Sequence, residues 1–226
     1  MRVVKLETMR ITIERIPAPM ASLYEKCSRM VIESYYRRLS EEIVSNLKKG
    51  IILDLGTGPG YLPIEIVKRS PSIKVHGIDL SDRLIRMART NASKASVADR
   101  LSFETGNAAE MRFGDNSYDM VISTGMLHHL KNPLQMLREC CRVLKPGGEA
   151  WIYDPAQVSG HIDLKELKAS LTLFERLMYM LFPLFTLINP SQTYKRDQVV
   201  AMISDTPFSE YWIKEENNEL QIKLKK

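Results

Sequence analysis

The sequence is poor in cysteine, with three among 226 residues, and two of these, Cys140 and Cys141, are adjacent. An odd number of cysteines that includes a neighbouring pair argues against a disulfide framework and favours a reducing compartment. Charged residues from Arg2 to Arg10 also leave no apolar run that would serve as a signal peptide. We therefore expect a cytoplasmic protein.

Long hydrophobic runs are missing as well. The uncharged stretch from Leu177 to Ile188 is broken by Pro183, and a membrane span needs about 20 apolar residues. The sequence has 32 basic and 27 acidic residues, and apart from the C-terminal lysines the excess is spread along the chain. The short apolar run argues against a transmembrane segment. The even spread of the charge argues against a nucleic-acid partner.

Strand and helix patterns alternate from residue 51 onward. Strands are expected at residues 51–55, 74–78, 101–105, 118–123 and 149–153, and helices at 61–69, after Ser81 and after Asn132. Strands joined by crossovers of helix length form a parallel sheet with helices on both faces. Residues 210–214 and 220–225 resemble two more strands, and the polar residues 215–218 between them predict an antiparallel hairpin.

These patterns predict one α/β domain with a Rossmann-like, doubly wound, mostly parallel seven-stranded sheet that ends in an antiparallel hairpin. An N-terminal arm and helical cap occupies residues 1–49, the core 50–155, an apolar helical insertion 156–194, and the last helix with the closing hairpin 195–226. Within the cap, Ser40 is expected to begin a short helix that carries Ile43 and Leu47 and ends at Gly50.

The first strand leads through Asp54 into a glycine-rich turn, with glycines at positions 56, 58 and 60. Glycine lets the backbone approach a ligand where a Cβ atom would collide with it. Asp54 is placed to orient the loop amides or to accept a hydrogen bond from a cationic ligand group. The second strand ends at Asp79, whose carboxylate can accept hydrogen bonds from both ribose hydroxyls. The pair indicates a cofactor that carries a nucleoside.

The third strand ends in Gly106-Asn107-Ala108, at the same edge of the predicted sheet. The side-chain oxygen of Asn107 is a candidate to accept a hydrogen bond from an adenine amino group, and a role in forming the turn is the alternative. The fourth strand ends in Ser123, Thr124 and Gly125, which we expect to contact the cofactor.

Several segments carry a family resemblance, in order along the chain: Asp54-Leu55-Gly56-Thr57-Gly58-Pro59-Gly60, Gly77-Ile78-Asp79-Leu80-Ser81, Gly106-Asn107-Ala108, Tyr118-Asp119-Met120-Val121-Ile122-Ser123, Leu127-His128-His129-Leu130 and Leu144-Lys145-Pro146-Gly147-Gly148. Over roughly residues 20–155, and more loosely in the hairpin, the sequence resembles the class I S-adenosylmethionine-dependent methyltransferases. The subgroup that includes quinone-biosynthesis and many small-molecule methyltransferases is the most similar. One departure is Asn107, where the family commonly has aspartate.

The resemblance implies S-adenosylmethionine as cofactor and S-adenosylhomocysteine as product. The residues it implies for cofactor binding are Tyr24, Asp54, Gly56, Thr57, Gly58, Gly60, Tyr61, Asp79, Leu80, Gly106, Asn107, Ala108, Ser123, Thr124 and Gly125. For Tyr24, ordinary packing is the alternative. A nicotinamide cofactor is disfavoured because the glycines follow the pattern Gly-x-Gly-x-Gly and not Gly-x-Gly-x-x-Gly.

The implied reaction is in-line displacement at a sulfonium methyl group, for which the protein supplies alignment, water exclusion and, for a protonated nucleophile, a base. His128 is the candidate for catalysis or cofactor contact. The alternative is that His128 and His129 only pack against or cap the next helix. No carboxylate cluster suggests a magnesium site, and no metal is expected.

The acceptor is expected to be a small organic molecule, because the motifs for methylating nucleic-acid bases, protein arginine or a magnesium-bound catechol are missing, and the apolar segment Leu164–Ile188 suggests an apolar or aromatic one. The apolar segment Leu164–Ile188 is a candidate lid over this acceptor. A homodimer interface, a peripheral membrane contact and plain core are its alternatives. Two other functions stay open: a non-catalytic partner subunit that binds S-adenosylmethionine, and an RNA or protein methyltransferase.

Overall fold

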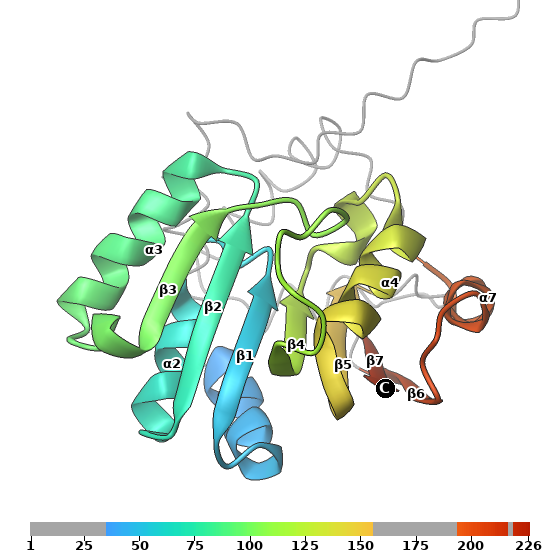
Figure 1. Cartoon of the computed structure of the whole chain (residues 1–226), viewed down its shortest axis with the longest axis horizontal. Coiled ribbons are helices and arrows are strands. Elements are labelled where there is room, and N and C mark those ends of the chain that lie inside the picture. Colours follow the sequence, from blue (N-terminus) through green and yellow to red (C-terminus); the bar gives the residue numbers. More distant parts are fainter. Residues whose placement is uncertain (1–34, 156–193, 217–218) are drawn as a thin grey trace, which may run out of the picture.

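The structure is a computed structural model, and it describes residues 35–155, 194–216 and 219–226. Its centre is a seven-stranded sheet with the strand order β3-β2-β1-β4-β5-β7-β6 (Figure 1). The strands are β1 (Gly50–Leu55), β2 (Ile73–Asp79), β3 (Leu101–Thr105), β4 (Tyr118–Thr124), β5 (Leu144–Pro155), β6 (Glu210–Glu216) and β7 (Glu219–Lys225). Strands β1 to β5 pair in parallel, whereas β7 is antiparallel to both β5 and β6. The predicted fold class is confirmed.

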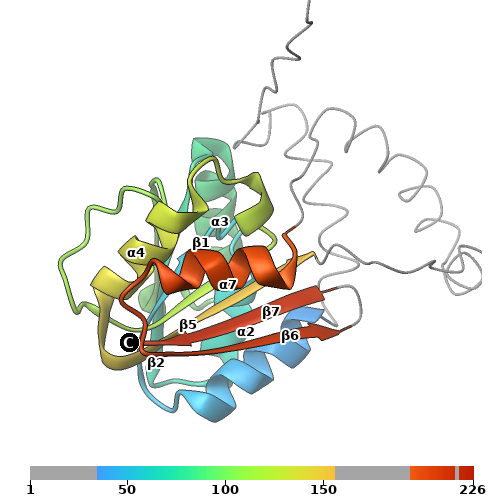
Figure 2. The same cartoon turned by 90° about the vertical axis from the view of Figure 1, so that its right-hand side faces the viewer.

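Helices cover both faces of the sheet and enclose two hydrophobic cores (Figure 2). The labelled helices are α2 (Tyr61–Arg69), α3 (Asp82–Lys94), α4 (Pro133–Val143) and α7 (Arg196–Ser204), and residues 35–46 are helical too. One core joins residues 35–46, α2 and α3 to one face, and the other joins α4 and α7 to the opposite face. Alternate residues of each buried strand feed the two cores, as the period of two requires.

Two of the predicted helix starts are confirmed by their caps. The Ser81 side chain accepts a hydrogen bond from the Leu84 amide at 3.4 Å, before α3. The Asn132 side chain accepts one from the Gln135 amide at 3.1 Å, and Pro133 occupies the first turn of α4. Each cap satisfies an amide that the helix itself leaves without a partner.

Other local predictions were wrong. Ser40 begins no helix: it lies inside the helical residues 35–46, fully buried, and donates to the Arg37 carbonyl at 2.8 Å. Strand β5 starts at Leu144, which pairs with Tyr118 of β4, and not at residue 149; the register between the two strands then shifts between Tyr118 and Met120. The Pro-Gly-Gly turn is therefore a bulge within a longer strand and not a loop before it.

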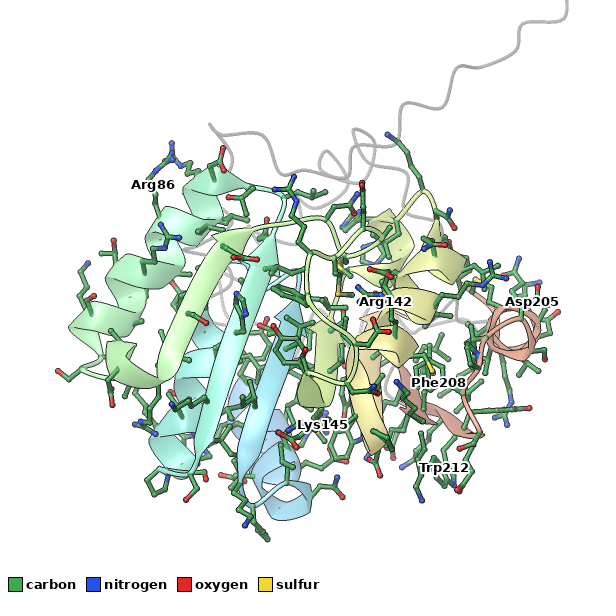
Figure 3. All side chains as sticks on the ribbon, in the orientation of Figure 1. Arg86, Arg142, Lys145, Asp205, Phe208 and Trp212 are labelled. Atoms are coloured by element: carbon green, nitrogen blue, oxygen red, sulfur yellow. The ribbon has the colours of Figure 1, made fainter. Side chains whose placement is uncertain are left out.

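The connection between β3 and β4, residues 106–117, contains no helix although parallel strands are usually joined by one. Arg142 of α4 holds this connection in place (Figure 3). Its guanidinium donates to the Phe113 carbonyl at 2.6 Å and to the Met111 carbonyl at 3.1 Å. Its charge is paired with Glu139 at 2.7 Å and with Asp115 at 2.8 Å. Hydrogen bonds from the Arg142 side chain thus fix the backbone of this connection, which has no helical hydrogen bonds of its own.

The chain order of the strands reverses between β1 and β4, which are neighbours in the sheet although β2 and β3 lie between them in sequence. In open α/β sheets, ligands bind outside the carboxyl ends of the strands at such a switch point. Asp54 pairs with Ile122 across this point. The fold therefore places the first strand's acid and the end of β4 beside the expected binding crevice.

Several predictions lie outside the described residues. These are Tyr24 and the N-terminal arm, the apolar segment Leu164–Ile188, and the tip of the hairpin at residues 217–218. Within the ranges that the structure describes, no helix is long and apolar enough to cross a membrane.

Candidate cofactor and active site

The glycine-rich turn adopts a backbone that requires glycine. Gly56, Gly58 and Gly60 have positive φ angles of 69°, 54° and 79°. A Cβ atom on Gly60 would lie 3.0 Å from Ala88 Cβ, and one on Gly56 would lie 2.9 Å from Met126 Sδ. A Cβ on Gly58 would have no neighbour closer than 4.0 Å. Packing therefore requires glycine at positions 56 and 60, whereas Gly58 leaves open space above the turn.

Asp79 connects the end of β2 to this turn. Its carboxylate accepts hydrogen bonds from the Gly58 amide at 3.0 Å and from the Ser81 amide at 2.8 Å. The Thr57 amide donates in turn to the Ile78 carbonyl at 2.9 Å. Asp79 is half-buried, so its carboxylate is both oriented and accessible at the edge of the sheet. The predicted pair of glycine turn and second acid is brought together.

Asp54 lies beneath the turn at the carboxyl end of β1, with only 2% of its surface exposed. The pKa of its carboxyl group is raised to about 7, mainly by burial; the Thr57 hydroxyl lowers this pKa and the nearby negative charge of Asp79 adds to the rise. A buried carboxyl without a cationic partner is costly to ionise. A cationic group placed near it would therefore be stabilised.

Asn107 takes part in a turn. Its side-chain oxygen accepts a hydrogen bond from the Ala109 amide at 2.9 Å, and the residue is exposed. The turn-forming alternative therefore describes the structure, although the second lone pair of this oxygen remains for an adenine amino group. The Gly106 amide donates to the Asp79 carbonyl at 3.1 Å, and Ala108 is buried. The third strand's end thus lies against the second.

The remaining predicted contacts lie around the same edge at different depths. Gly125 is exposed, Thr124 is half-buried with its hydroxyl 3.5 Å from the Tyr36 hydroxyl, and Ser123 is fully buried. Tyr61 at the start of α2 and Leu80 after β2 are half-buried. Ser123 is thereby placed within the sheet and not at its surface.

His128 forms a dyad with Asp154, which lies near the end of β5. His128 Nδ1 lies 3.0 Å from both carboxylate oxygens of Asp154. The same carboxylate accepts from the backbone amides of Leu127 at 3.0 Å and His128 at 3.1 Å. Asp154 is 2% exposed, so a buried carboxylate receives three N–H groups and fixes the ring. Because a carboxylate only accepts, Nδ1 carries the proton, which leaves Nε2 of the neutral ring as an acceptor.

His129 stays neutral beside this dyad. Its ring centroid lies 3.8 Å from that of His128. The pKa of His129 is lowered to about 4, mainly by burial and in addition by the neighbouring His128. Of the two rings, His128 is the one held by the Asp154 carboxylate. The two neighbouring histidines therefore differ in role.

Asp154 and Asn91 were missed by the sequence interpretation. Asn91 of α3 is buried and donates to the Pro59 carbonyl at 3.0 Å, which holds the glycine turn from behind. Asp154 carries the signal used for Asp54 and Asp79, an acid directly after a buried apolar strand. No such signal marks Asn91, because its position on a helix face depends on tertiary packing.

A depression of about 420 Å³ lies at the opposite, amino-terminal ends of the strands. Its lining includes Ile51, Lys74, Ser102 and the hydrogen-bonded pair of His76 and Tyr118, 2.9 Å apart. It contains neither the glycine turn nor the acids that follow the strands. We therefore place the functional site at the carboxyl edge, where the polar groups converge.

The residues at this edge fit a nucleoside-bearing sulfonium cofactor. Gly58 leaves room for close approach to the turn, and Asp79 offers an oriented acceptor for hydroxyl groups. Asp54 supplies a buried carboxyl that favours a nearby positive charge. Among the described residues, no group of three or more His, Cys, Asp or Glu side chains is arranged to hold a metal ion.

Comparison with known proteins agrees with this geometry. A family model described as a methyltransferase domain matches residues 46–220. The ubiquinone/menaquinone biosynthesis C-methyltransferase of Geotalea daltonii is 28% identical over 151 residues, which cover 66% of this chain and 63% of that protein. The 27-O-demethylrifamycin SV methyltransferase of Amycolatopsis mediterranei is 35% identical over 103 residues, or 46% of this chain and 38% of that protein.

The fold has close structural counterparts. A crystal structure from Methanococcus maripaludis, assigned as an S-adenosyl-L-methionine-dependent methyltransferase, superimposes with a TM-score of 0.74 at 24% identity and covers 91% of both chains. At this identity the likeness concerns the fold. The two sequence relatives above are each matched over less than two thirds of their own length.

Proposed function

The chain belongs to the methyltransferase domain family, and from this premise we propose that it transfers a methyl group from S-adenosylmethionine to a small, apolar or aromatic organic acceptor. One observation carries the proposal. The glycine turn after β1 is hydrogen-bonded to the acid that ends β2, at the switch point of the sheet. That is where a doubly wound sheet binds a nucleoside.

In this proposal, Asp79 accepts hydrogen bonds from the ribose hydroxyls, and Gly58 allows the ligand to approach the backbone. Asp54 lies beneath them and favours the positive charge of the ligand, because ionisation of a buried carboxyl is easier beside a cation. Asn107 would accept from the adenine amino group with its second lone pair. Gly106 and Ala108 fix the turn that presents it.

When bound, S-adenosylmethionine supplies a methyl group on a positively charged sulfur, which is an excellent leaving group. The contribution of the chain is alignment and proton removal. Asp154 holds His128 through Nδ1, so Nε2 is the basic atom available to an acceptor hydroxyl. His128 would take this proton as the methyl group is transferred, and the buried carboxylate would stabilise the resulting imidazolium.

The dyad favours catalysis over a role as a non-catalytic partner subunit, since a module that only binds the cofactor has no use for an oriented base. A small organic acceptor is supported by the relatives, whose names describe a quinone C-methyltransferase and a rifamycin methyltransferase. These relatives do not favour an RNA or protein acceptor. A cytoplasmic location is part of the proposal and is supported by the free, buried thiols of Cys140 and Cys141. The lid role of Leu164–Ile188 is also retained as a proposal.

The test is an assay of S-adenosylhomocysteine formation with a panel of phenols, hydroquinones and aliphatic alcohols. We expect turnover with at least one apolar acceptor, and we expect His128→Ala to lower kcat on the order of a hundredfold or more. Asp154→Asn should also lower kcat and should change its pH dependence, because the amide no longer fixes the proton on Nδ1. Asp99→Asn, on the exposed surface, is the matched control.

The outcomes separate the candidates. If the protein binds S-adenosylhomocysteine but shows no turnover with any acceptor in the panel, or with RNA and protein substrates, the binding-subunit alternative replaces the enzyme. Turnover that is insensitive to both His128→Ala and Asp154→Asn would remove the base from the mechanism while leaving the methyltransferase intact.

A further inference from the structure

Strand β6 forms one edge of the sheet and pairs only with β7 among the described residues. Two of its aromatic side chains are open to solvent: Tyr211 is 45% exposed and Trp212 is 52% exposed. Figure 3 shows Trp212 at the margin of the molecule, on the side of β6 and α7. An edge strand with exposed aromatic side chains is a template for pairing with another strand.

Among the described residues no strand pairs with the outer side of β6, and the direction of its backbone groups follows from the pairing of β7. The Lys226 amide donates to the Gly148 carbonyl at 3.0 Å, and bonded positions alternate along an antiparallel strand. The backbone N–H and C=O groups of the preceding residue, Lys225, therefore point toward β6, where Lys225 pairs with Glu210. It follows that the odd-numbered residues of β6 turn their N–H and C=O groups outward. The bond from the Arg196 guanidinium to the Ile213 carbonyl at 3.0 Å agrees with this direction.

We propose that two copies of the chain pair through β6, antiparallel and centred on Trp212, so that their sheets become continuous. In this register, Trp212 lies opposite Trp212 of the second copy, and Glu210 lies opposite Lys214 of the second copy. Tyr211 lies opposite Ile213, and both turn their backbone groups toward the shared edge. Because of the two-fold symmetry, each pair of two different residues occurs twice in the interface. The surface is therefore complementary to itself in charge, in backbone bonding and in apolar side chains.

The charges disfavour the neighbouring register that is centred on Ile213. A pairing centred on Ile213 would place Glu210 opposite Glu216, and like charges directly opposite each other destabilise a sheet. Within one chain, Glu210 lies 3.4 Å from Lys225, and Lys214 lies 2.7 Å from Glu216. These ion pairs are solvent-exposed, and such pairs contribute little to stability. Replacing them with ion pairs between the two copies therefore costs little.

The other edge of the sheet lacks these features. Strand β3 is shorter, its exposed residues include Ser102 and Glu104, and Arg89 donates twice to the Phe103 carbonyl, at 2.6 and 3.2 Å. At β6, Arg196 makes only one bond to the Ile213 carbonyl, which keeps a second lone pair. The two edges therefore differ, and β6 is the one suited to a second copy.

The experiment is sedimentation of the full chain over a range of concentrations, with a charge swap. We expect a monomer–dimer equilibrium in the wild type. Glu210→Lys alone and Lys214→Glu alone each place two like-charged pairs in the interface, and each should raise the dimer dissociation constant about tenfold or more. The double variant restores opposite charges and should recover most of the wild-type affinity. Trp212→Ala should weaken the dimer without rescue.

The control is Ile51→Ala, a 40% exposed apolar residue of the interior strand β1, which should leave the dimer unchanged. A wild type that remains monomeric at all concentrations would overturn the proposal. A dimer that tolerates both single charge changes and Trp212→Ala forms through another surface, which would also overturn it. Single variants that dissociate without recovery in the double variant would overturn the register. This test is independent of the catalytic proposal.

Discussion

Replacing Asp54 by asparagine should stabilise the protein in the absence of cofactor, and increasingly so as the pH rises. The rise of the Asp54 pKa from 3.8 to about 7 on folding corresponds, at 1.36 kcal/mol per pH unit, to about 4 kcal/mol. Below the unfolded pKa the carboxyl is protonated in both states and has no effect. Between the two pKa values the unfolded state ionises first, so the wild type loses stability as the pH rises. Above about 7 the loss is complete.

Asparagine has nearly the same shape and cannot ionise, so the variant escapes this loss. Urea unfolding of the wild type and Asp54→Asn should show an advantage for the variant that grows by roughly 2 to 3 kcal/mol from pH 5 to pH 8. The same substitution should weaken S-adenosylmethionine binding, because the buried negative charge is gone. Parallel stability curves for the two proteins would refute the assignment of a raised pKa to Asp54.

Other predictions concern the turn and the crossover. Gly58→Ala should weaken S-adenosylhomocysteine binding at least tenfold by calorimetry and lose about 1 kcal/mol of unfolding free energy. Gly147→Ala, also at positive φ with open space around it, should lose similar stability but keep affinity; equal affinities in the two variants would contradict the role of Gly58. Arg142→Ala should lower the unfolding free energy by about 2 kcal/mol, since two carbonyls of the crossover lose their donor, whereas exposed Arg112→Ala should have little effect in the same urea titration.

The sequence predicted the parts of the fold that depend on local patterns. An acid that directly follows a buried strand identified Asp54 and Asp79, because parallel strands place their carboxyl ends at one edge. Ser81 and Asn132 were correctly predicted as helix caps, because each satisfies a helix amide that lies within four residues of it in the sequence.

Features that depend on distant contacts were not predictable in this way. Ser40 resembles a cap in sequence, but tertiary packing continues the helix through it. The absence of a helix between β3 and β4 depends on Arg142, which lies about 30 residues further along. The partner of His128 is Asp154, separated from it by 26 residues, and only the sheet brings the ends of β4 and β5 together.

The most direct test of the account is calorimetric titration with S-adenosylhomocysteine and, separately, with NADH. We expect the wild type to bind S-adenosylhomocysteine and not NADH. Asp79→Ala should weaken this binding at least tenfold, because both the ribose acceptor and the bond to the Gly58 amide are lost, and Asp99→Ala should not. Binding of NADH in place of S-adenosylhomocysteine, or affinity unchanged by Asp79→Ala, would contradict the proposed cofactor site.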